Sequence, residues 1–185
     1  MNHLVFGNKD KKVHETALIL QKALTKKGYR VTIDDSDKSF GYKISEKEVS
    51  GVPFSLIIGP KDVAANKAML YRRDTREKTE VSLITLVPSF RKLVREYQSN
   101  LMKRAKANLE SRIVKLDNFE DYKKALEQGK LILAPWGGDE NDEKELKKQT
   151  GSTPRCIKSE IKSPNTKCFF TGKKAKYYVY FARAY

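Results

Sequence analysis

Residues 54–58 restrict the fold of this chain more than any other part of the sequence. They read Phe-Ser-Leu-Ile-Ile, so Ser55 is the one polar side chain in the run, and Gly59 and Pro60 end it. A short run that is apolar at nearly every position is typical of a strand buried on both faces in a parallel sheet, which needs helices to cover it. We therefore expect an α/β fold around this strand.

The neighbouring segments predict a helix and further strands. Apolar side chains recur every three or four positions between residues 10 and 28, which is typical of one buried face of a helix, and Gly28 suits its end. Residues 4–6, 31–33, 68–71 and 79–83 predict short strands, whereas the stretch around Gly41 reads as irregular and residues 72–78 as a charged turn. This order predicts an α/β sandwich of about 85 residues with a mixed sheet.

A long helix is expected next, with Pro88 in its first turn. Its apolar residues keep a spacing of three to four up to Leu109, and its other face is strongly basic. The basic residues include Arg91, Arg95 and Lys103. Such a face is either simply solvated or contacts the phosphates of RNA, because lysine and arginine release counterions from a nucleic-acid backbone.

The last third of the chain predicts a small α+β domain. Asn118 suits a helix N-cap, residues 131–134 predict a strand, and residues 139–150 predict a charged helix closed by Gly151. Residues 153–157, 167–170 and 177–181 are further strand candidates. We place the domains at residues 1–86 and 113–185, with residues 87–112 as a linking helix.

Composition narrows the class of protein. The chain has 38 Lys and Arg against 23 Asp and Glu, a formal net charge of +15, and 39% hydrophobic residues, which is too many for a disordered chain. No stretch approaches the roughly 18 apolar residues of a membrane span, and two cysteines indicate a cytosolic protein. The charge makes a polyanion the expected partner, with nucleic acid first and an acidic membrane surface second.

The sequence shows no catalytic site. It has no glycine-rich phosphate loop, and its two histidines, His3 and His14, are isolated and early in the chain, so they cannot form a nucleophilic triad with the late cysteines. We expect no catalytic residue here, which favours a binding module or one part of a larger enzyme.

One ordered set of short motifs carries a family resemblance. Asp34-Asp35, Gly41-Tyr42-Lys43, Glu48, Gly51-Val52-Pro53, residues 58–62 and Arg72-Arg73-Asp74-Thr75 occur in this order. The set resembles the anticodon-binding domain of class II aminoacyl-tRNA synthetases, in the subgroup for Pro, Thr, Gly and His. The resemblance implies a five-stranded mixed sheet with helices.

The resemblance also implies an RNA site, and the residue types suit it. A carboxylate accepts the N1–H and N2–H₂ donors of guanine, and Lys or Arg can meet O6 or N7. Proline anticodons share two guanines. Many relatives have an arginine directly after the paired aspartates, where this chain has Ser36, and nearby Lys38 can supply that charge. The expected contact residues are Asp34, Asp35, Lys38, Lys43, Glu48, Arg72, Arg73 and Asp74. The competing interpretation is that Asp34-Asp35 caps a loop and that Arg72-Arg73-Asp74 forms surface ion pairs.

The C-terminal part resembles the extra domain that ends prolyl-tRNA synthetases of the eukaryotic and archaeal type. The resemblance rests on Ala134-Pro135-Trp136, Gly138-Asp139-Glu140, residues 150–157, residues 172–177 and the ending Tyr180-Phe181-Ala182-Arg183-Ala184-Tyr185. Many members hold zinc with four cysteines. The corresponding positions here are Gly137, Asp142, Cys168 and Thr171, so one thiolate is left and we expect no structural zinc. The core would instead depend on aromatic residues. They are Trp136, Phe169, Phe170, Tyr178 and Tyr180.

The resemblance implies that the chain is the C-terminal portion of a cytoplasmic enzyme that uses ATP and Mg to attach proline to tRNA(Pro). The catalytic domain, through which such enzymes form homodimers, would lie upstream, and Tyr185 would dock onto it. We expect the chain alone to bind tRNA without charging it, with no membrane partner. The alternatives are a freestanding RNA-binding module with the same fold, and an interaction protein whose basic helix meets an acidic partner or a membrane surface.

Overall fold

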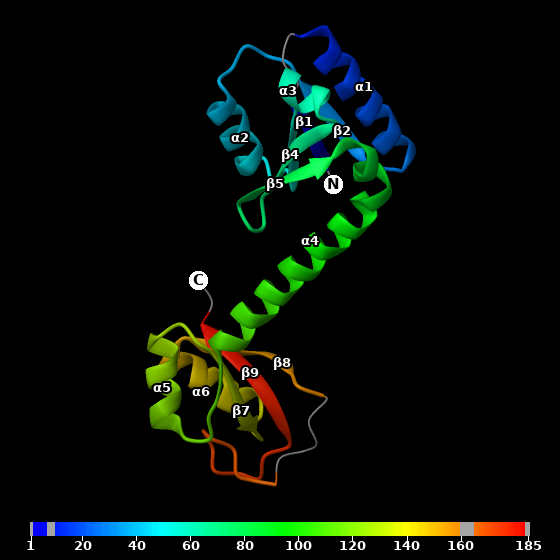
Figure 1. The fold of residues 1–185 in the computed structure, drawn as a ribbon. Coiled ribbons are helices and arrows are strands. Elements are labelled where there is room, and N and C mark those ends of the chain that lie inside the picture. The colour runs from blue at the N-terminus through cyan, green and yellow to red at the C-terminus, as the bar shows by residue number, and fades with distance from the viewer. Residues whose placement is uncertain (1, 7–9, 160–164, 184–185) are drawn as a thin grey trace. The chain divides into compact units, whose positions relative to one another are not determined.

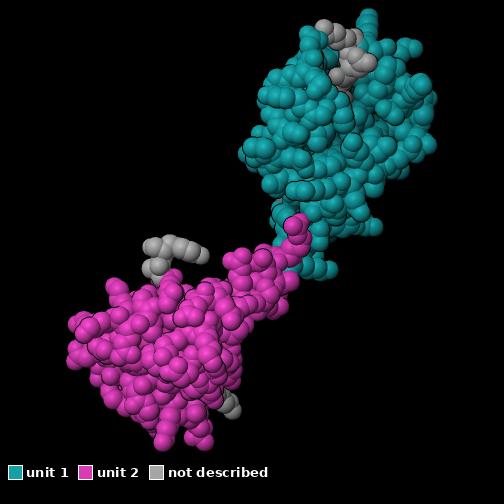
Figure 2. Space-filling view, turned by 90° about the vertical axis from the view of Figure 1, so that its left-hand side faces the viewer, with its two compact units in different colours: residues 1–103 teal, residues 104–185 magenta. Residues whose placement is uncertain are grey.

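The computed structural model describes residues 2–6 along the backbone and residues 10–159 and 165–183 in full. It divides into two compact units, Met1–Lys103 and Arg104–Tyr185 (Figure 2). The division falls inside helix α4, Leu83–Arg112, at a point within residues 87–112, the segment expected to link the domains.

Unit 1 is built on a five-stranded mixed sheet in the order β2-β1-β3-β4-β5, which confirms the expected α/β class. Strands β1 (Asn2–Phe6), β2 (Arg30–Asp34) and β3 (Phe54–Ile57) are parallel. Strands β4 (Lys67–Arg72) and β5 (Glu77–Ser82) complete the sheet in antiparallel pairing. The apolar run at residues 54–58 is the source of the central strand β3, with Phe54 and Leu56 in the core.

Helix α1, Lys11–Lys26, lies where its apolar spacing predicted. Asp10 caps it by accepting the backbone N–H groups of Lys12 and Val13, and Val13, Ala17, Leu20 and Leu24 are all buried. These side chains pack with β3, β4 and α4 in one hydrophobic core. Figure 1 shows α1 and α2 on either side of this sheet.

Helix α4 begins at Leu83, four residues before the expected start at residue 87, so Pro88 is not in its first turn. Leu86 and Phe90 are buried in the core of unit 1, so the first turn is held by packing rather than by a proline at its start. Pro88 lies inside the helix and removes the N–H partner of the Ile84 carbonyl. Both residues are exposed, so water can bond that carbonyl.

Helix α2, Phe40–Val49, replaces the irregular stretch that the sequence predicted around Gly41. Ser39 caps it, with the Tyr42 backbone N–H 3.4 Å from Ser39 Oγ. Lys43 is its one buried residue, while Phe40 and Tyr42 are exposed. The helix therefore has no buried apolar stripe, which is the signal that identifies helices in sequence. A short helix α3, Pro60–Ala64, also follows β3 where only a strand end was expected.

Unit 2 contains a four-stranded sheet in the order β6-β7-β9-β8. Its strands are β6 (Ile113–Lys115), β7 (Leu131–Trp136), β8 (Ser152–Ile157) and β9 (Tyr177–Arg183). Helices α5, Phe119–Glu127, and α6, Glu140–Thr150, have the predicted caps at Asn118 and Gly151. Asp139, predicted as the first residue of the second helix, is its N-cap. Tyr122 of α5 and Leu146 of α6 pack in one cluster with β7 and β9, so both helices cover the same sheet face.

Two sequence predictions for unit 2 are wrong. Tyr178 and Tyr180 do not fill the core, because alternation along β9 turns Val179 and Phe181 inward instead. Residues 167–170 do not form a strand. One isolated bridge joins Lys167 to Lys174, and the turn that follows inserts Phe169 into the core, with its ring centroid 4.4 Å from that of Tyr122.

Candidate nucleic-acid interface

The residues predicted to contact RNA do not form one cluster. Strand register places Asp34 level with Phe6, and Phe6 level with Ile57. Arg72 is level with Phe54, three residues away along β3. Asp34 and Arg72 therefore lie at opposite ends of the sheet, on strands that are not neighbours.

Asp34 and Lys43 form a shielded ion pair. Lys43 Nζ lies 3.4 Å from Asp34 Oδ1 and donates to the Asp34 carbonyl oxygen at 3.1 Å. Their side chains are 12% and 8% exposed. Burial raises the pKa of Asp34, but the hydrogen bonds from Ser36 and the charge of Lys43 together lower it by more. The pKa of Asp34 therefore lies below its ordinary value. The pair holds α2 against the end of β2.

Glu48 and Arg73 join the last turn of α2 to the end of β4. The Tyr71 hydroxyl donates to the Glu48 carboxylate, and Arg73 Nε donates to the Glu48 carbonyl oxygen at 3.0 Å. Burial, followed by the hydrogen bond to Glu48, raises the pKa of Tyr71 to about 12. Glu48 is thus engaged within the fold, whereas Arg73 is largely exposed.

Arg72 and Asp74 fix the β4–β5 turn onto α4. Arg72 donates to both Asp74 oxygens, at 3.2 and 2.8 Å, and Asn100 donates to Asp74 Oδ2 at 2.8 Å. Arg72 also pairs with Glu96 at 3.5 Å. The Asp74 side chain has no exposed area, so the pair is neither a surface pair nor positioned to read a base.

Two exposed aromatic rings on α2 were missed by the sequence reasoning. Tyr42 is 55% exposed with Lys38 Nζ 4.8 Å from its ring centre, and Phe40 is 42% exposed with Lys78 Nζ 5.1 Å from its ring centre. We call the group Asp35, Lys38, Phe40, Tyr42 and Lys78 the α2 surface. The sequence did contain a signal for them: both aromatic residues lie in a polar segment, and neither belongs to an apolar stripe. Exposed rings beside cations suit the stacking of unpaired bases and the binding of their phosphates.

The basic face of α4 within unit 1 is open to solvent. Arg91, Arg95 and Lys103 are all exposed. They suit contact with a phosphate backbone and carry no base specificity.

Comparison with known protein families matches both units. Residues 4–93 match the family described as "Anticodon binding domain", and residues 119–185 match "Prolyl-tRNA synthetase, C-terminal". The chain belongs to the prolyl-tRNA synthetase family.

Relatives and solved structures agree with this assignment. The "Proline--tRNA ligase" of Mycoplasma mobile is 39% identical over 181 residues, which are 98% of this chain and 38% of that protein. The ligase of Malacoplasma penetrans is 43% identical over 85% of this chain and 34% of its own length. The prolyl-tRNA synthetase of Cryptosporidium parvum, solved with L-proline and AMP, superposes with a TM-score of 0.90 at 30% identity, over 100% of this chain and 40% of that one. The chain thus spans less than half the length of these relatives.

The zinc that the family resemblance implies does not fit the residues of this chain. A Cβ atom added to Gly137 would lie 2.2 Å from the Lys174 carbonyl oxygen, so a cysteine has no room there. Asp142 accepts a hydrogen bond from Lys173 Nζ at 2.7 Å, so its carboxylate is already engaged. Cys168 is the one cysteine among the four corresponding positions. Across the described residues, no three His, Cys, Asp or Glu side chains form a group suited to a metal ion. None of the described helices is both long and apolar enough to span a membrane.

Proposed function

We propose that this chain binds the anticodon loop of tRNA(Pro) through the α2 surface. The observation that carries the proposal is the exposure of Phe40 and Tyr42 beside Lys38 and Lys78 in a domain of the anticodon-binding family. The bases of an anticodon loop can be splayed out of their stack, and an exposed aromatic ring can then stack against them.

The predicted contact residues take different roles in this proposal. Asp35 is exposed and accepts the N1–H and N2–H₂ donors of a guanine, and Lys38 meets its other edge or the adjoining phosphate. Arg73, beside the last turn of α2, meets a phosphate elsewhere in the loop. Asp34, Lys43, Glu48, Arg72 and Asp74 position α2 and the β4–β5 turn, because their charged groups are engaged inside the fold. Arg91, Arg95 and Lys103 contact the phosphates of the stem.

We further propose that the proline–tRNA ligase activity of the relatives belongs to a longer protein, which uses ATP and Mg and dimerises through a catalytic domain in the cytoplasm. The present chain contributes tRNA binding and no catalytic residue. Tyr185, expected to dock onto the catalytic domain, lies outside the described residues. The C-terminal domain folds without structural zinc.

Binding of anticodon stem-loops to the 185-residue chain tests the proposal. We expect tighter binding to the stem-loop with the proline anticodon than to one whose two shared guanines are replaced by adenine. Tyr42→Ala and Phe40→Ala should each weaken binding about tenfold, since stacking contributes on the order of 1–3 kcal/mol per base. Ile19→Ala is the matched control, because Ile19 is 66% exposed on α1. Equal affinity for the two stem-loops would overturn the proposed anticodon recognition.

A further inference from the structure

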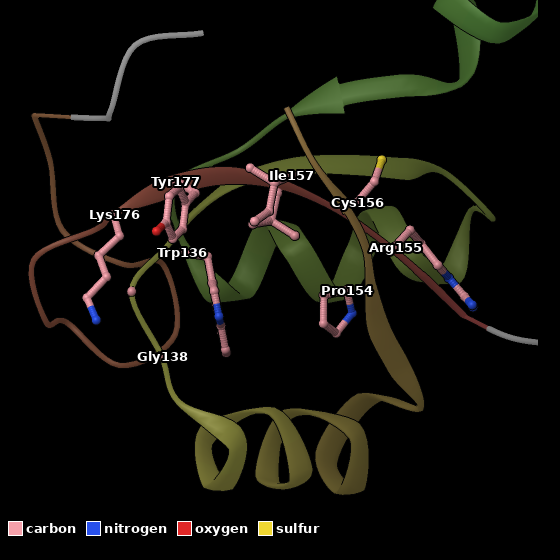
Figure 3. Close-up of a pocket in the computed structure, with 10 residues that line it drawn as sticks. Trp136, Gly138, Pro154, Arg155, Cys156, Ile157, Lys176 and Tyr177 are labelled. Atoms are coloured by element: carbon pink, nitrogen blue, oxygen red, sulfur yellow. The ribbon is translucent and has the colours of Figure 1, made fainter. Parts of the chain in front are cut away.

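Unit 2 contains a pocket that takes no part in the proposed anticodon site. Its volume is about 420 Å³, which is within the range of sites for small organic groups. Figure 3 shows it between the end of β7 and the edge strand β8, with helix α6 below. The residues that form it include Trp136, Gly138, Pro154, Ile157, Lys176 and Tyr177.

One wall of the pocket is the indole of Trp136, which is held in place from behind. Phe181 contacts it edge-on at a centroid distance of 5.4 Å, and Phe169 lies 6.0 Å away. Gly138 lies against its other side, because a Cβ atom there would come within 2.4 Å of Trp136 Cζ2. The ring therefore has a fixed orientation, and because Trp136 is only 8% exposed, an occupant would meet a small part of it.

The opposite wall depends on an irregularity in β8. Pro154 pairs with Phe181 and Ile157 with Val179, and the pairing shifts between Pro154 and Cys156. In a regular strand, residues 154 and 157 would face opposite sides of the sheet, but the extra residue brings both to the same side. Figure 3 shows Cys156 directed away from Pro154 and Ile157. Ile157 is left 53% exposed, so about half of its side chain is open to an occupant of the pocket.

The rim of the pocket is cationic. Lys176 and Arg155 are exposed at its edges, and none of the described residues that line it is acidic. Arg155 donates to the Ala182 carbonyl oxygen at 3.2 Å and is directed along the strand, whereas Figure 3 shows Lys176 beside Tyr177, on the Gly138 side of the pocket. Tyr177, 49% exposed, adds a second aromatic ring. Aromatic and apolar walls with a positive rim fit a flat, apolar group that carries a negative charge.

We propose that this pocket binds a single unpaired nucleotide of an RNA strand. The base lies against Trp136 and Ile157, and its phosphate meets Lys176. The choice of RNA as the source rests on the proposed function, whereas the nucleotide chemistry rests on the pocket alone. Such a site would give the chain a second RNA contact, in unit 2, in addition to the α2 surface in unit 1.

Intrinsic fluorescence reports directly on this pocket, because Trp136 is the one tryptophan of the chain. We would titrate the 185-residue chain with AMP and with a short unpaired RNA oligonucleotide. We expect saturable quenching by both, with the oligonucleotide binding more tightly. Ile157→Glu and Lys176→Glu should each weaken binding about tenfold, the scale of losing one stacked base.

A matched variant separates the pocket from general electrostatics. Lys148→Glu changes the net charge as Lys176→Glu does, at an exposed position of α6 away from the pocket, and should weaken binding less than threefold. The double variant Phe40→Ala/Tyr42→Ala should leave the AMP titration unchanged, so failure of the anticodon proposal would not affect this result. Thermal unfolding of each variant shows whether unit 2 is intact, and Ile157→Ala replaces Ile157→Glu if that variant does not fold.

Three outcomes would overturn the proposal. The first is no saturable quenching by AMP at millimolar concentration or by the oligonucleotide. The second is an equal effect of Lys148→Glu and Lys176→Glu, which would indicate diffuse attraction. The third is quenching by an acidic peptide but by neither nucleotide ligand, which would assign the pocket to a protein partner.

Discussion

The ammonium group of Lys173 lies 2.7 Å from Asp142 Oδ2 and 3.5 Å from Asp139 Oδ2. This ion pair joins the turn after Phe170 to the first turn of α6. The two segments hold Asp142 and Thr171, two of the four metal positions that the family resemblance implies. Asp142, one of the four metal positions that the resemblance implies, is therefore paired with a cation of this chain.

Lys173→Met should lower the melting temperature of unit 2, by a small amount because the pair is exposed. The hydrogen bond from Lys173 lowers the pKa of Asp142, so the stabilisation is present above the carboxyl's ordinary pKa and is lost as pH falls through the lowered value. The pKa of Lys173 is raised, so the same stabilisation is lost as pH rises through that value. Unfolding monitored by Trp136 fluorescence at pH 3 and pH 7 checks this, with Lys144→Met, another exposed ion-paired lysine of unit 2, as the control.

Chelation should leave unit 2 folded. With one thiolate and an occupied carboxylate, the zinc positions of this chain cannot complete a tetrahedral site. We expect the same melting curve with and without EDTA. A stoichiometric zinc signal in elemental analysis of the purified chain would contradict the prediction.

Asp74→Ala should destabilise unit 1 by about 3 kcal/mol, since it leaves Arg72 without its main partner in a largely buried position. Burial raises the pKa of Asp74, but hydrogen bonds from Arg72 and Asn100 lower it more. This stabilisation is therefore lost as pH falls below the ordinary aspartate range. Calorimetry measures the effect. Trp136 lies in unit 2, so its fluorescence follows the unfolding of that unit, and the other calorimetric transition belongs to unit 1. Glu15→Ala, which removes an exposed carboxylate of α1, should have little effect.

The elements that the sequence revealed are those with a buried stripe or a clear cap. Four buried apolar residues identify α1, and Asn118 and Asp139 mark the starts of α5 and α6. Helix α2 has one buried residue, Lys43, which forms an ion pair with Asp34 at the end of β2. A pattern search cannot detect a helix that is held by an ion pair formed only in the folded chain.

The site residues show the same limit. Residue chemistry and order predicted which segments belong to the anticodon-binding domain, but not which charges are used within the fold. Asp74 and Asp35 are the same type of residue in the sequence, yet one is fully buried against Arg72 and the other is exposed. Only the tertiary contacts separate a positioning residue from one that can reach a ligand.

Tyr122→Phe should destabilise unit 2 by about 1 kcal/mol, the typical net value of one hydrogen bond. The Tyr122 hydroxyl lies 2.6 Å from Ser152 Oγ, which lies 2.6 Å from Thr150 Oγ1, so Ser152 keeps one partner in the variant. Burial raises the pKa of Tyr122 to about 12, against a smaller lowering by Ser152. The folded state thus keeps a proton that the unfolded state loses near pH 10, and stability falls as pH rises from about 10 to 12. Trp136 fluorescence should show a steeper loss for the wild type than for Tyr122→Phe, and parallel curves would contradict the assignment.

The basic face of α4 should control how RNA binding depends on salt. Each phosphate contact contributes a slope of about −0.9 to the logarithm of the binding constant against that of the salt concentration. If Arg91, Arg95 and Lys103 each contact one phosphate, changing all three to Gln should reduce the slope for the anticodon stem-loop by between about 2 and 3. The preference for the guanine-containing loop should remain, because phosphate contacts carry no base information. Lys11, Lys12 and Lys22 are exposed on α1 of the same unit, so their change to Gln is the matched control. An equal reduction in slope by both triple variants would show that α4 acts only through net charge and not as a contact face.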